Sequence, residues 1–136
     1  QMTVLLAEDN IVNQKVASKM LQKLGCDVLI AQNGREAIEM LSLHPQVRLI
    51  LMDCRMPEMD GLEATRRLRL RAAYEHVPII ALTANVFEED RQKCQAAGMN
   101  DFVAKPVEPG LLYATLARWI PAQPHPPPLL PIRSPS

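Results

Sequence analysis

The chain has 136 residues, 48% of them hydrophobic, which suits one domain of ordinary size with a substantial core. Its 15 basic and 15 acidic residues cancel, so the net charge favours neither nucleic acid nor a membrane surface as a partner. No apolar stretch approaches the roughly 20 residues that a membrane-spanning helix needs. The first residues show no signal peptide and pass directly into a strand pattern, which suggests a fragment of a longer protein.

Five short apolar runs alternate with five helical patterns. The runs, near 3–7, 27–31, 48–52, 78–82 and 102–104, predict strands, and the segments 12–24, 34–43, 61–72, 87–97 and 109–119 predict helices. In the first helix, Val12, Val16 and Met20 recur at intervals of four, with Leu21 and Leu24 on the neighbouring edge. This alternation with short connections predicts an α/β sandwich with right-handed crossovers. The length suits a flavodoxin-like (βα)5 fold, with a parallel sheet of strand order 2-1-3-4-5.

Charged and polar residues stand at the ends of four of the predicted strands. They are Glu8, Asp9, Asp53, Thr83 and Lys105. Because the carboxyl ends of parallel strands meet at one edge of the sheet, we expect these side chains to share a crevice. Three carboxylates, a hydroxyl and an ammonium are suited to a divalent metal and a phosphoryl group.

Each of these residues also has a purely structural interpretation. Asp9 or Asn10 could cap the first helix, Thr83 could cap the fourth, and Lys105 could simply be solvated. The joint pattern, with every residue at a strand end, favours a site over these separate explanations. The histidines lie in predicted loops or in the C-terminal segment and suit no catalytic pair; they are His44, His76 and His125.

The three cysteines, Cys26, Cys54 and Cys94, are far apart in the sequence and form no Cys-x-x-Cys pair. Neither a zinc site nor a disulfide framework is therefore expected, and a reducing, cytoplasmic location fits best. Cys54 follows Asp53, but no histidine is placed to activate it as a nucleophile. We interpret it as an ordinary buried or half-exposed thiol.

Two further segments carry no predicted chemistry. An arginine run on the third helix (Arg66, Arg67, Arg69 and Arg71) is interpreted as a solvated face. The proline-rich segment 121–136 can neither continue a helix nor join a sheet, so we interpret it as a disordered tail or linker. A ligand for a proline-recognition domain is the alternative for this segment.

The combined motifs resemble the receiver domain of two-component response regulators. They are Glu8-Asp9-Asn10, Asp53-x-x-Met56-Pro57-x-x-Asp60-Gly61, Thr83-Ala84 and Lys105-Pro106. The resemblance implies a receiver domain at 1–120, followed by the proline-rich tail. Details such as Ala81-Leu82-Thr83-Ala84-Asn85 are most similar to receivers fused to hybrid sensor histidine kinases, which usually lack a DNA-binding output domain.

The resemblance also implies roles for individual residues. Asp53 would be the phosphoacceptor, forming an acyl phosphate. Mg²⁺, or Mn²⁺, would be bound by Asp9, Asp53 and the backbone carbonyl of Arg55, with Glu8 acting through a bound water. The domain would then catalyse its own phosphorylation and dephosphorylation.

Other roles concern the phosphoryl group and the response to it. Lys105 and Thr83 would contact the phosphoryl oxygens, and Arg55 and Asn85 would modulate the reaction. Thr83 would move on phosphorylation, and the aromatic residue three positions before the lysine, here Phe102, would rotate inward. Because Phe102 lacks the hydroxyl of the usual tyrosine, this switch would rest on packing alone.

The partners implied are a histidine kinase domain and a histidine phosphotransfer domain docking over the first helix. We expect this domain to bind no nucleic acid and to make no direct membrane contact, although the parent protein could be membrane-anchored. The domain itself is expected to be a monomer or a weak dimer. One alternative is a phosphorylation-independent interaction module, against which the complete acidic site argues. Another is a flavin or nucleotide enzyme, which the absence of a glycine-rich loop disfavours.

Overall fold

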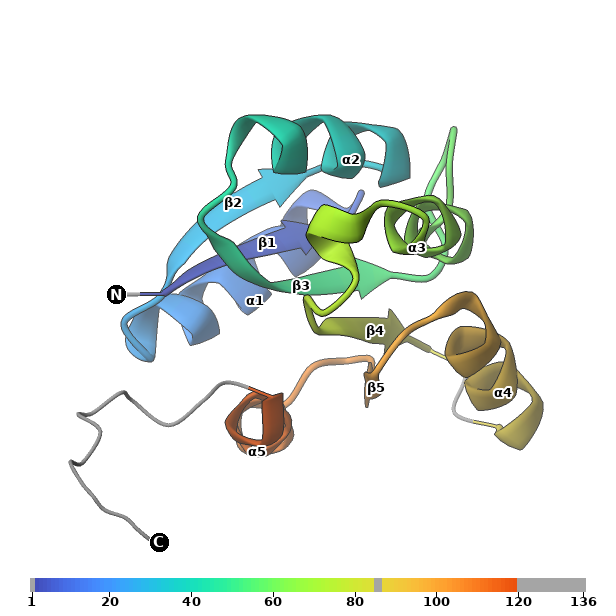
Figure 1. The fold of residues 1–136 in the computed structure, drawn as a ribbon. Coiled ribbons are helices and arrows are strands. Elements are labelled where there is room, and N and C mark those ends of the chain that lie inside the picture. Colours follow the sequence, from blue (N-terminus) through green and yellow to red (C-terminus); the bar gives the residue numbers. More distant parts are fainter. Residues whose placement is uncertain (1, 85–86, 120–136) are drawn as a thin grey trace, which may run out of the picture.

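The computed structural model describes residues 2–84 and 87–119, which form a three-layer α/β sandwich around one parallel sheet (Figure 1). The five strands lie in the order β2-β1-β3-β4-β5, so the predicted flavodoxin-like topology is confirmed. The strands are β1 (Thr3–Ala7), β2 (Asp27–Ala31), β3 (Val47–Asp53), β4 (Ile79–Thr83) and β5 (Asp101–Ala104). The predicted tail, 121–136, lies outside the described residues.

Helices cover both faces of the sheet, with α1 and α5 on one side and α2, α3 and α4 on the other (Figure 1). Their bounds are α1 (Ile11–Lys23), α2 (Gly34–Leu43), α3 (Gly61–Arg69), α4 (Glu88–Ala97) and α5 (Pro109–Trp119), and a short 3-10 helix, η1 (Ala72–Tyr74), follows α3. The prediction that the third helix continues to residue 72 is wrong, because the chain leaves the α-helix after Arg69. No helix among the described residues is both long and apolar enough to cross a membrane.

The strands divide their side chains between two apolar cores. Leu5 and Ile50 belong to the core beneath α2 and α3, whereas Leu6 and Leu51 belong to the core beneath α1 and α5. All four side chains are fully buried. A parallel strand covered on both faces has no solvent side, which is why these strands are apolar without alternation. The two cores thus enclose the sheet whose strand ends carry the predicted site residues.

The helical periodicity predicted for α1 is confirmed, but the predicted apolar stripe lies largely outside the core. Val12 is 67% exposed and Val16 is 44% exposed. Met20, the third residue of the stripe, packs against the core, and the buried face carries Ala17 and the predicted Leu21. α1 therefore presents apolar side chains to solvent close to the end of β1.

Arg69 shows that one part of the predicted solvated arginine face is wrong. Its guanidinium donates hydrogen bonds to the carbonyl oxygens of Gly98, Tyr74 and Val77 at 2.9, 2.6 and 2.8 Å, and to Asn100 Oδ1 at 2.7 Å. Arg69 therefore joins the end of α3 to the end of α4 and satisfies carbonyls that the turn leaves without helical partners. The other three arginines of the run are exposed, as predicted.

Candidate functional site

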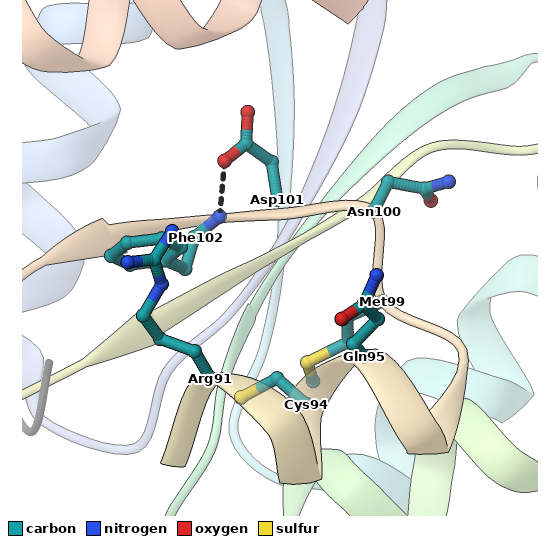
Figure 2. A pocket seen from close by; sticks show the side chains of 7 residues that line it. All are labelled: Arg91, Cys94, Gln95, Met99, Asn100, Asp101 and Phe102. Atoms are coloured by element: carbon teal, nitrogen blue, oxygen red, sulfur yellow. Dashed lines mark hydrogen bonds between the residues drawn. The ribbon is translucent and has the colours of Figure 1, made fainter. Parts of the chain in front are cut away.

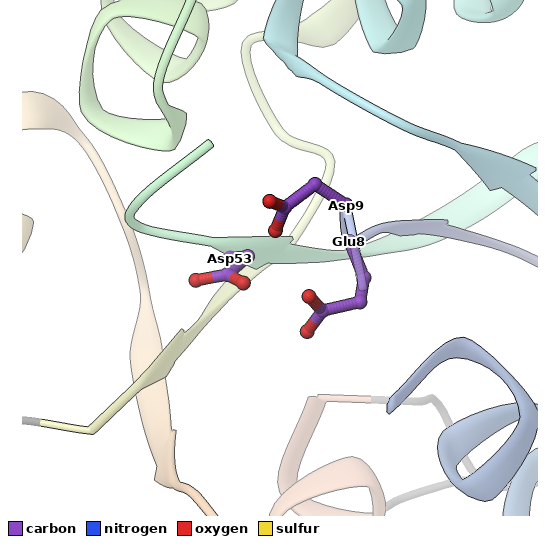
Figure 3. A group of neighbouring side chains, drawn as sticks. All are labelled: Glu8, Asp9 and Asp53. Atoms are coloured by element: carbon purple, nitrogen blue, oxygen red, sulfur yellow. The ribbon is translucent and has the colours of Figure 1, made fainter. Parts of the chain in front are cut away.

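Three carboxylates meet at the carboxyl ends of the neighbouring strands β1 and β3. Glu8 and Asp9 follow β1 directly, and Asp53 is the last residue of β3. One ligand oxygen from each lies within 4.8 Å of the other two, and Figure 3 shows the three side chains grouped at these strand ends. Glu8 is 1% exposed and Asp53 is 3% exposed, whereas Asp9 faces solvent. The predicted convergence of these three residues is confirmed.

The carboxylate of Glu8 is held by the turn that starts α1. The Asn10 backbone N–H donates to Glu8 Oε2 at 3.0 Å, while the Asn10 side chain caps α1 by accepting from the Asn13 N–H. The Gln14 side chain donates to the Glu8 carbonyl oxygen at 2.6 Å. Asn10 therefore caps α1 and positions Glu8 at the same time, so the capping interpretation does not exclude the site interpretation. No sequence signal had singled out Gln14 for this contact.

Burial raises the pKa of Glu8 above its ordinary value, and the negative charge of Asp53 raises it further. The hydrogen bond from the Asn10 N–H and the charge of Lys105 act in the opposite direction without cancelling the rise. Keeping the buried Glu8 carboxylate ionised therefore costs the folded protein desolvation free energy. A cation binding beside Glu8 would relieve that cost.

Lys105 brings the positive charge of the site from the end of β5. Its Nζ lies 2.7 Å from Asp53 Oδ2 and 3.4 Å from Glu8 Oε1. Its backbone N–H donates to the Thr83 carbonyl oxygen at 2.9 Å, and the Lys105–Pro106 peptide bond is cis. Burial alone lowers the pKa of Lys105, but the hydrogen bond and charge of Asp53, together with Glu8, raise it overall. Lys105 is therefore a firmly protonated partner for two carboxylates.

A cleft of about 240 Å³ opens between these side chains and reaches Asn13, Arg55 and Thr83. Thr83 ends β4 and is buried, as expected of a residue that lines the floor of the cleft. The Arg55 backbone N–H donates to Asp53 Oδ1 at 3.1 Å. The Arg55 side chain is exposed, and in the described part of the chain it forms no ion pair with Glu8. Asn85 lies outside the described residues.

Gly61 packs against the end of β3 too closely for any side chain. A Cβ at this position would lie 2.1 Å from the Asp53 carbonyl oxygen and 2.8 Å from Met52 Cγ. The preceding Asp60 caps α3 by accepting from the Glu63 N–H at 2.9 Å. The Asp60-Gly61 pair thus starts α3 in direct contact with β3, the strand that carries Asp53.

Comparison with known proteins decides the family. The model of the response regulator receiver domain family matches residues 4–117 of this chain. The chain belongs to this family. Its sequence is 45% identical over 121 residues to hybrid signal transduction histidine kinase H of Dictyostelium discoideum, covering 86% of this chain and 9% of that protein. It is 35% identical over 136 residues to histidine kinase 2 of Arabidopsis thaliana, covering 85% of this chain and 12% of that one.

Solved receiver domains have the same fold. One is the receiver domain of a Pseudomonas aeruginosa sensor histidine kinase with a magnesium ion coordinated in its active site cleft. It has a TM-score of 0.76 and 45% identity, with 88% of this chain and 97% of that chain covered. Another is the receiver domain of Saccharomyces cerevisiae Ssk1 in complex with the histidine phosphotransfer protein Ypd1. It has a TM-score of 0.80 and 31% identity, with 88% of each chain covered. The predicted resemblance to hybrid-kinase receivers is thereby confirmed.

The receiver domain has a second cleft, of about 340 Å³, between the loop after β3 and α4. Cys54 and Cys94 both line it, and their sulfur atoms are 3.5 Å apart. Burial raises the pKa of the Cys54 thiol, and Cys94 and Asp53 raise it further. Cys54 is therefore a neutral thiol at physiological pH, in agreement with the interpretation that it is no catalytic nucleophile. Its proximity to Cys94 had no signal in the sequence.

A smaller hollow of about 150 Å³ lies between α4 and β5 (Figure 2). The guanidinium of Arg91 lies over the ring of Phe102, 4.4 Å from its centroid. Such a cation–π contact contributes about 0.5–1 kcal/mol at a partly exposed site. Phe102, the expected switch aromatic, is half-buried and in contact with α4 in this structure.

Proposed function

We propose that this receiver domain accepts a phosphoryl group from a phosphohistidine onto Asp53, within a phosphorelay of a hybrid sensor histidine kinase. One observation carries the proposal. Asp53 is buried at the end of β3, paired with Lys105 at 2.7 Å, and grouped with Glu8 and Asp9 within 4.8 Å. The chain spans only 9% of the length of hybrid signal transduction histidine kinase H and 6% of that of hybrid signal transduction histidine kinase B, so the hybrid-kinase parent protein is part of this proposal.

The donor set at this site fits a hard divalent cation. Mg²⁺ prefers oxygen ligands and commonly takes one or two carboxylates while keeping several waters. In this proposal Asp9, Asp53 and the Arg55 carbonyl oxygen bind Mg²⁺ or Mn²⁺, and Glu8 acts through a water. The bound ion would supply positive charge for the carboxylate and phosphoryl oxygens. The magnesium coordinated in the related P. aeruginosa receiver supports this assignment.

The transfer itself needs little more than position and charge. A carboxylate oxygen of Asp53 attacks phosphorus, an O–P bond forms, and the N–P bond to the donor imidazole breaks with its electron pair going to nitrogen. Lys105 neutralises part of the negative charge that two anions bring together. Thr83 lines the same cleft and would donate a hydrogen bond to a phosphoryl oxygen.

The proposed docking surface for the phosphodonor is the exposed apolar side of α1. Ile11 is 63% exposed, and Val12 and Val16 continue the same surface. This surface adjoins the cleft through Asn13. A histidine phosphotransfer domain or a histidine kinase domain would place its phosphohistidine over Asp53 by covering these residues. The solved complex of a related receiver with the phosphotransfer protein Ypd1 supports this kind of partner.

The response would then pass from Thr83 to Phe102. Phosphorylation adds about 1.5–2 negative charges and three acceptor oxygens beside Thr83. The half-buried ring of Phe102 would rotate inward and leave its contact with Arg91. We propose a cytoplasmic domain that acts as a monomer or weak dimer. The complete site argues against the phosphorylation-independent alternative, since Glu8, Asp9 and Asp53 are grouped within 4.8 Å and Lys105 is paired with Asp53 and Glu8.

The decisive experiment is intact mass spectrometry after incubation with acetyl phosphate, with and without Mg²⁺. The wild type should gain one phosphoryl group only with Mg²⁺, and Asp53→Asn should gain none. Asp27→Asn is the matched control, because Asp27 begins β2 at the opposite end of the sheet. Failure of the wild type to be phosphorylated by acetyl phosphate and by phosphorylated histidine phosphotransfer proteins would overturn the proposal. Equal phosphorylation of wild type and Asp53→Asn would show that another residue is the phosphoacceptor.

A further inference from the structure

Two of the three cysteines meet across the second cleft. Cys54 belongs to the loop that follows β3, and Cys94 belongs to α4, 40 positions further along the chain. Their sulfur atoms are 3.5 Å apart. Cys26 lies on the opposite face of the sheet, in the core beneath α1 and α5. The chain therefore contains one close thiol pair and one separate thiol that serves as an internal reference.

The cleft gives small reagents a way to this pair. Cys54 is half-buried, and both thiols line the cleft of about 340 Å³ that opens between the β3–α3 loop and α4. Met56 and Leu62 form apolar parts of its lining. A buried pair without such an opening would be inert packing. Here Cys54 is the more accessible thiol of the pair, and Cys94 is buried behind it at the wall of the same cleft.

The distance between the sulfur atoms is close to what a covalent bond requires. A disulfide holds its sulfur atoms about 2.05 Å apart. From 3.5 Å, the two atoms need to approach by about 1.5 Å. Rotation of the side chains together with a small shift of the β3–α3 loop can supply a movement of this size. Because the residues come from different elements, the bond would join the loop after β3 covalently to α4.

We propose that Cys54 and Cys94 form a dithiol–disulfide site, whose oxidation ties the loop next to Asp53 to α4. The oxidant is a low-molecular-weight disulfide. Because the raised pKa of Cys54 keeps most of this thiol neutral, the reaction proceeds through the small deprotonated fraction: one cysteine, as the thiolate, attacks a sulfur of the oxidant, forms a mixed disulfide and expels one small thiolate. The second cysteine then attacks the protein sulfur of that mixed disulfide and expels the second small thiolate. The two thiol protons pass to the expelled thiolates, so two protein thiols are oxidised and one small disulfide is reduced.

The bond would act on the adjacent acidic site through the backbone. Cys54 directly follows Asp53, and its N–H already donates to the Leu82 carbonyl oxygen at 3.0 Å. A link from Cys54 to α4 would restrain the end of β3, the loop after it and α4 together. If the site works as proposed above, oxidation should slow phosphorylation of Asp53 several-fold. This consequence rests on the proposed function, whereas the thiol chemistry does not.

The test uses the full chain and oxidised glutathione, with alkylation by N-ethylmaleimide under denaturing conditions after an acid quench. The reduced protein should take up three labels, one for each cysteine, and the oxidised protein one, on Cys26. Peptide mapping should find Cys54 and Cys94 in one cross-linked pair that dithiothreitol separates. Cys26→Ser should form the same bond, whereas Cys94→Ser should form none within the chain. Three labels after oxidation, a bond that includes Cys26, or cross-links only between molecules would overturn the proposal.

A second measurement separates this proposal from the proposed function. Phosphorylation by acetyl phosphate is followed for reduced and oxidised wild type, with Cys94→Ser exposed to the same oxidant as the control. A slower reaction of the oxidised wild type alone supports the effect on the acidic site. Equal rates for oxidised and reduced protein overturn that effect while leaving the proposed function intact. No phosphorylation of the reduced protein counts against the proposed function, and the alkylation result still decides the disulfide.

Discussion

The ammonium of Lys105 lies 2.7 Å from a carboxylate oxygen of Asp53, although the two residues are 52 positions apart in the sequence. The same ammonium is 3.4 Å from Glu8. One cation is therefore shared by two buried carboxylates, while the third carboxylate of the group, Asp9, faces solvent. This imbalance of charge is the source of the first two predictions.

Replacing Lys105 by methionine should destabilise the metal-free protein. The substitution leaves Asp53 and Glu8 buried without their cation, and breaking a buried pair costs about 3–5 kcal/mol. Since the Lys105 side chain is 21% exposed, we expect about 1–3 kcal/mol after allowance for solvent screening. Urea unfolding without Mg²⁺ measures the loss, and Lys105→Arg should retain most of the stability. An unchanged free energy of unfolding for Lys105→Met would show that solvent alone suffices to screen the site.

Asp53→Asn should have the opposite effect and raise the melting temperature without Mg²⁺. Two unit charges at 4 Å repel each other by about 4 kcal/mol at an effective dielectric constant of 20. Lys105 offsets only part of this repulsion, because its single positive charge is shared between Asp53 and Glu8. A net gain of about 1 kcal/mol would shift the melting temperature by about 3 °C. The gain should shrink when Mg²⁺ is added; a lower melting temperature than wild type in its absence would contradict the crowded-carboxylate picture.

Asp101 should make stability depend on acid pH at a place remote from the acidic site. Burial raises its pKa, but hydrogen bonds from Trp119 Nε1, at 2.9 Å, from Arg118, at 2.7 Å, and from the Phe102 N–H outweigh burial and lower it overall. A depressed pKa means that the contribution to stability is present above the ordinary value of 3.8 and is lost as the pH falls through the folded value.

Comparison of wild type with Asp101→Asn in urea isolates this contribution. The variant should be less stable at neutral pH by less than about 1 kcal/mol, because the carboxylate is partly exposed and screened. The difference should shrink as the pH falls below the ordinary pKa of an aspartate and disappear below the depressed pKa of Asp101 in the folded protein. A difference that stays constant with pH would mean that the hydrogen bonds do not depend on the negative charge.

Gly61→Ala should displace the start of α3 from β3. The added Cβ would meet the Asp53 carbonyl oxygen at 2.1 Å, and backbone atoms there cannot rotate away. We expect a loss of about 1–3 kcal/mol in the free energy of unfolding, as for other overpacked sites. Gly110→Ala is the matched control, because a Cβ at Gly110 meets no atom within 4 Å. Equal effects of the two substitutions would show that the contact at Gly61 relaxes without cost.

Much of this molecule follows from local pattern and sheet geometry. The predicted bounds of α2 and α5 agree with the structure, and their starts carry clear local signals: Asn33 before α2 and Pro109 at the start of α5. Glu8, Asp53 and Lys105 could be predicted to meet because parallel strands bring their carboxyl ends to one edge. Family resemblance added the roles, which remain predictions.

The remaining features depend on the tertiary arrangement of the helices. Periodicity along α1 shows that it is a helix, but not that Val12 faces solvent. The arginine run has no local mark that distinguishes Arg69, whose partners lie up to 31 positions away. Cys54 and Cys94 meet only because α4 packs beside the loop after β3. Side chains of ordinary appearance in the sequence acquire their roles from such distant neighbours.

Arg55 should slow the loss of the phosphoryl group from Asp53. Its backbone N–H is fixed by Asp53 Oδ1 at 3.1 Å, while its side chain is exposed and lines the cleft. Glu8 is paired with Lys105 and not with Arg55. The arginine side chain is therefore not held by Glu8, and we expect it to shield the phosphoryl group on Asp53 from water. The phosphorylated wild type should therefore lose its phosphoryl group several-fold more slowly than Arg55→Asn. The decay of the phosphorylated mass after removal of acetyl phosphate measures both rates.

Arg55→Lys is the matched control for this prediction. A rate near that of the wild type would assign the effect to charge, and a rate near that of Arg55→Asn would assign it to the size of the guanidinium. Equal or faster decay of the wild type relative to Arg55→Asn would rule out any protective role for this side chain.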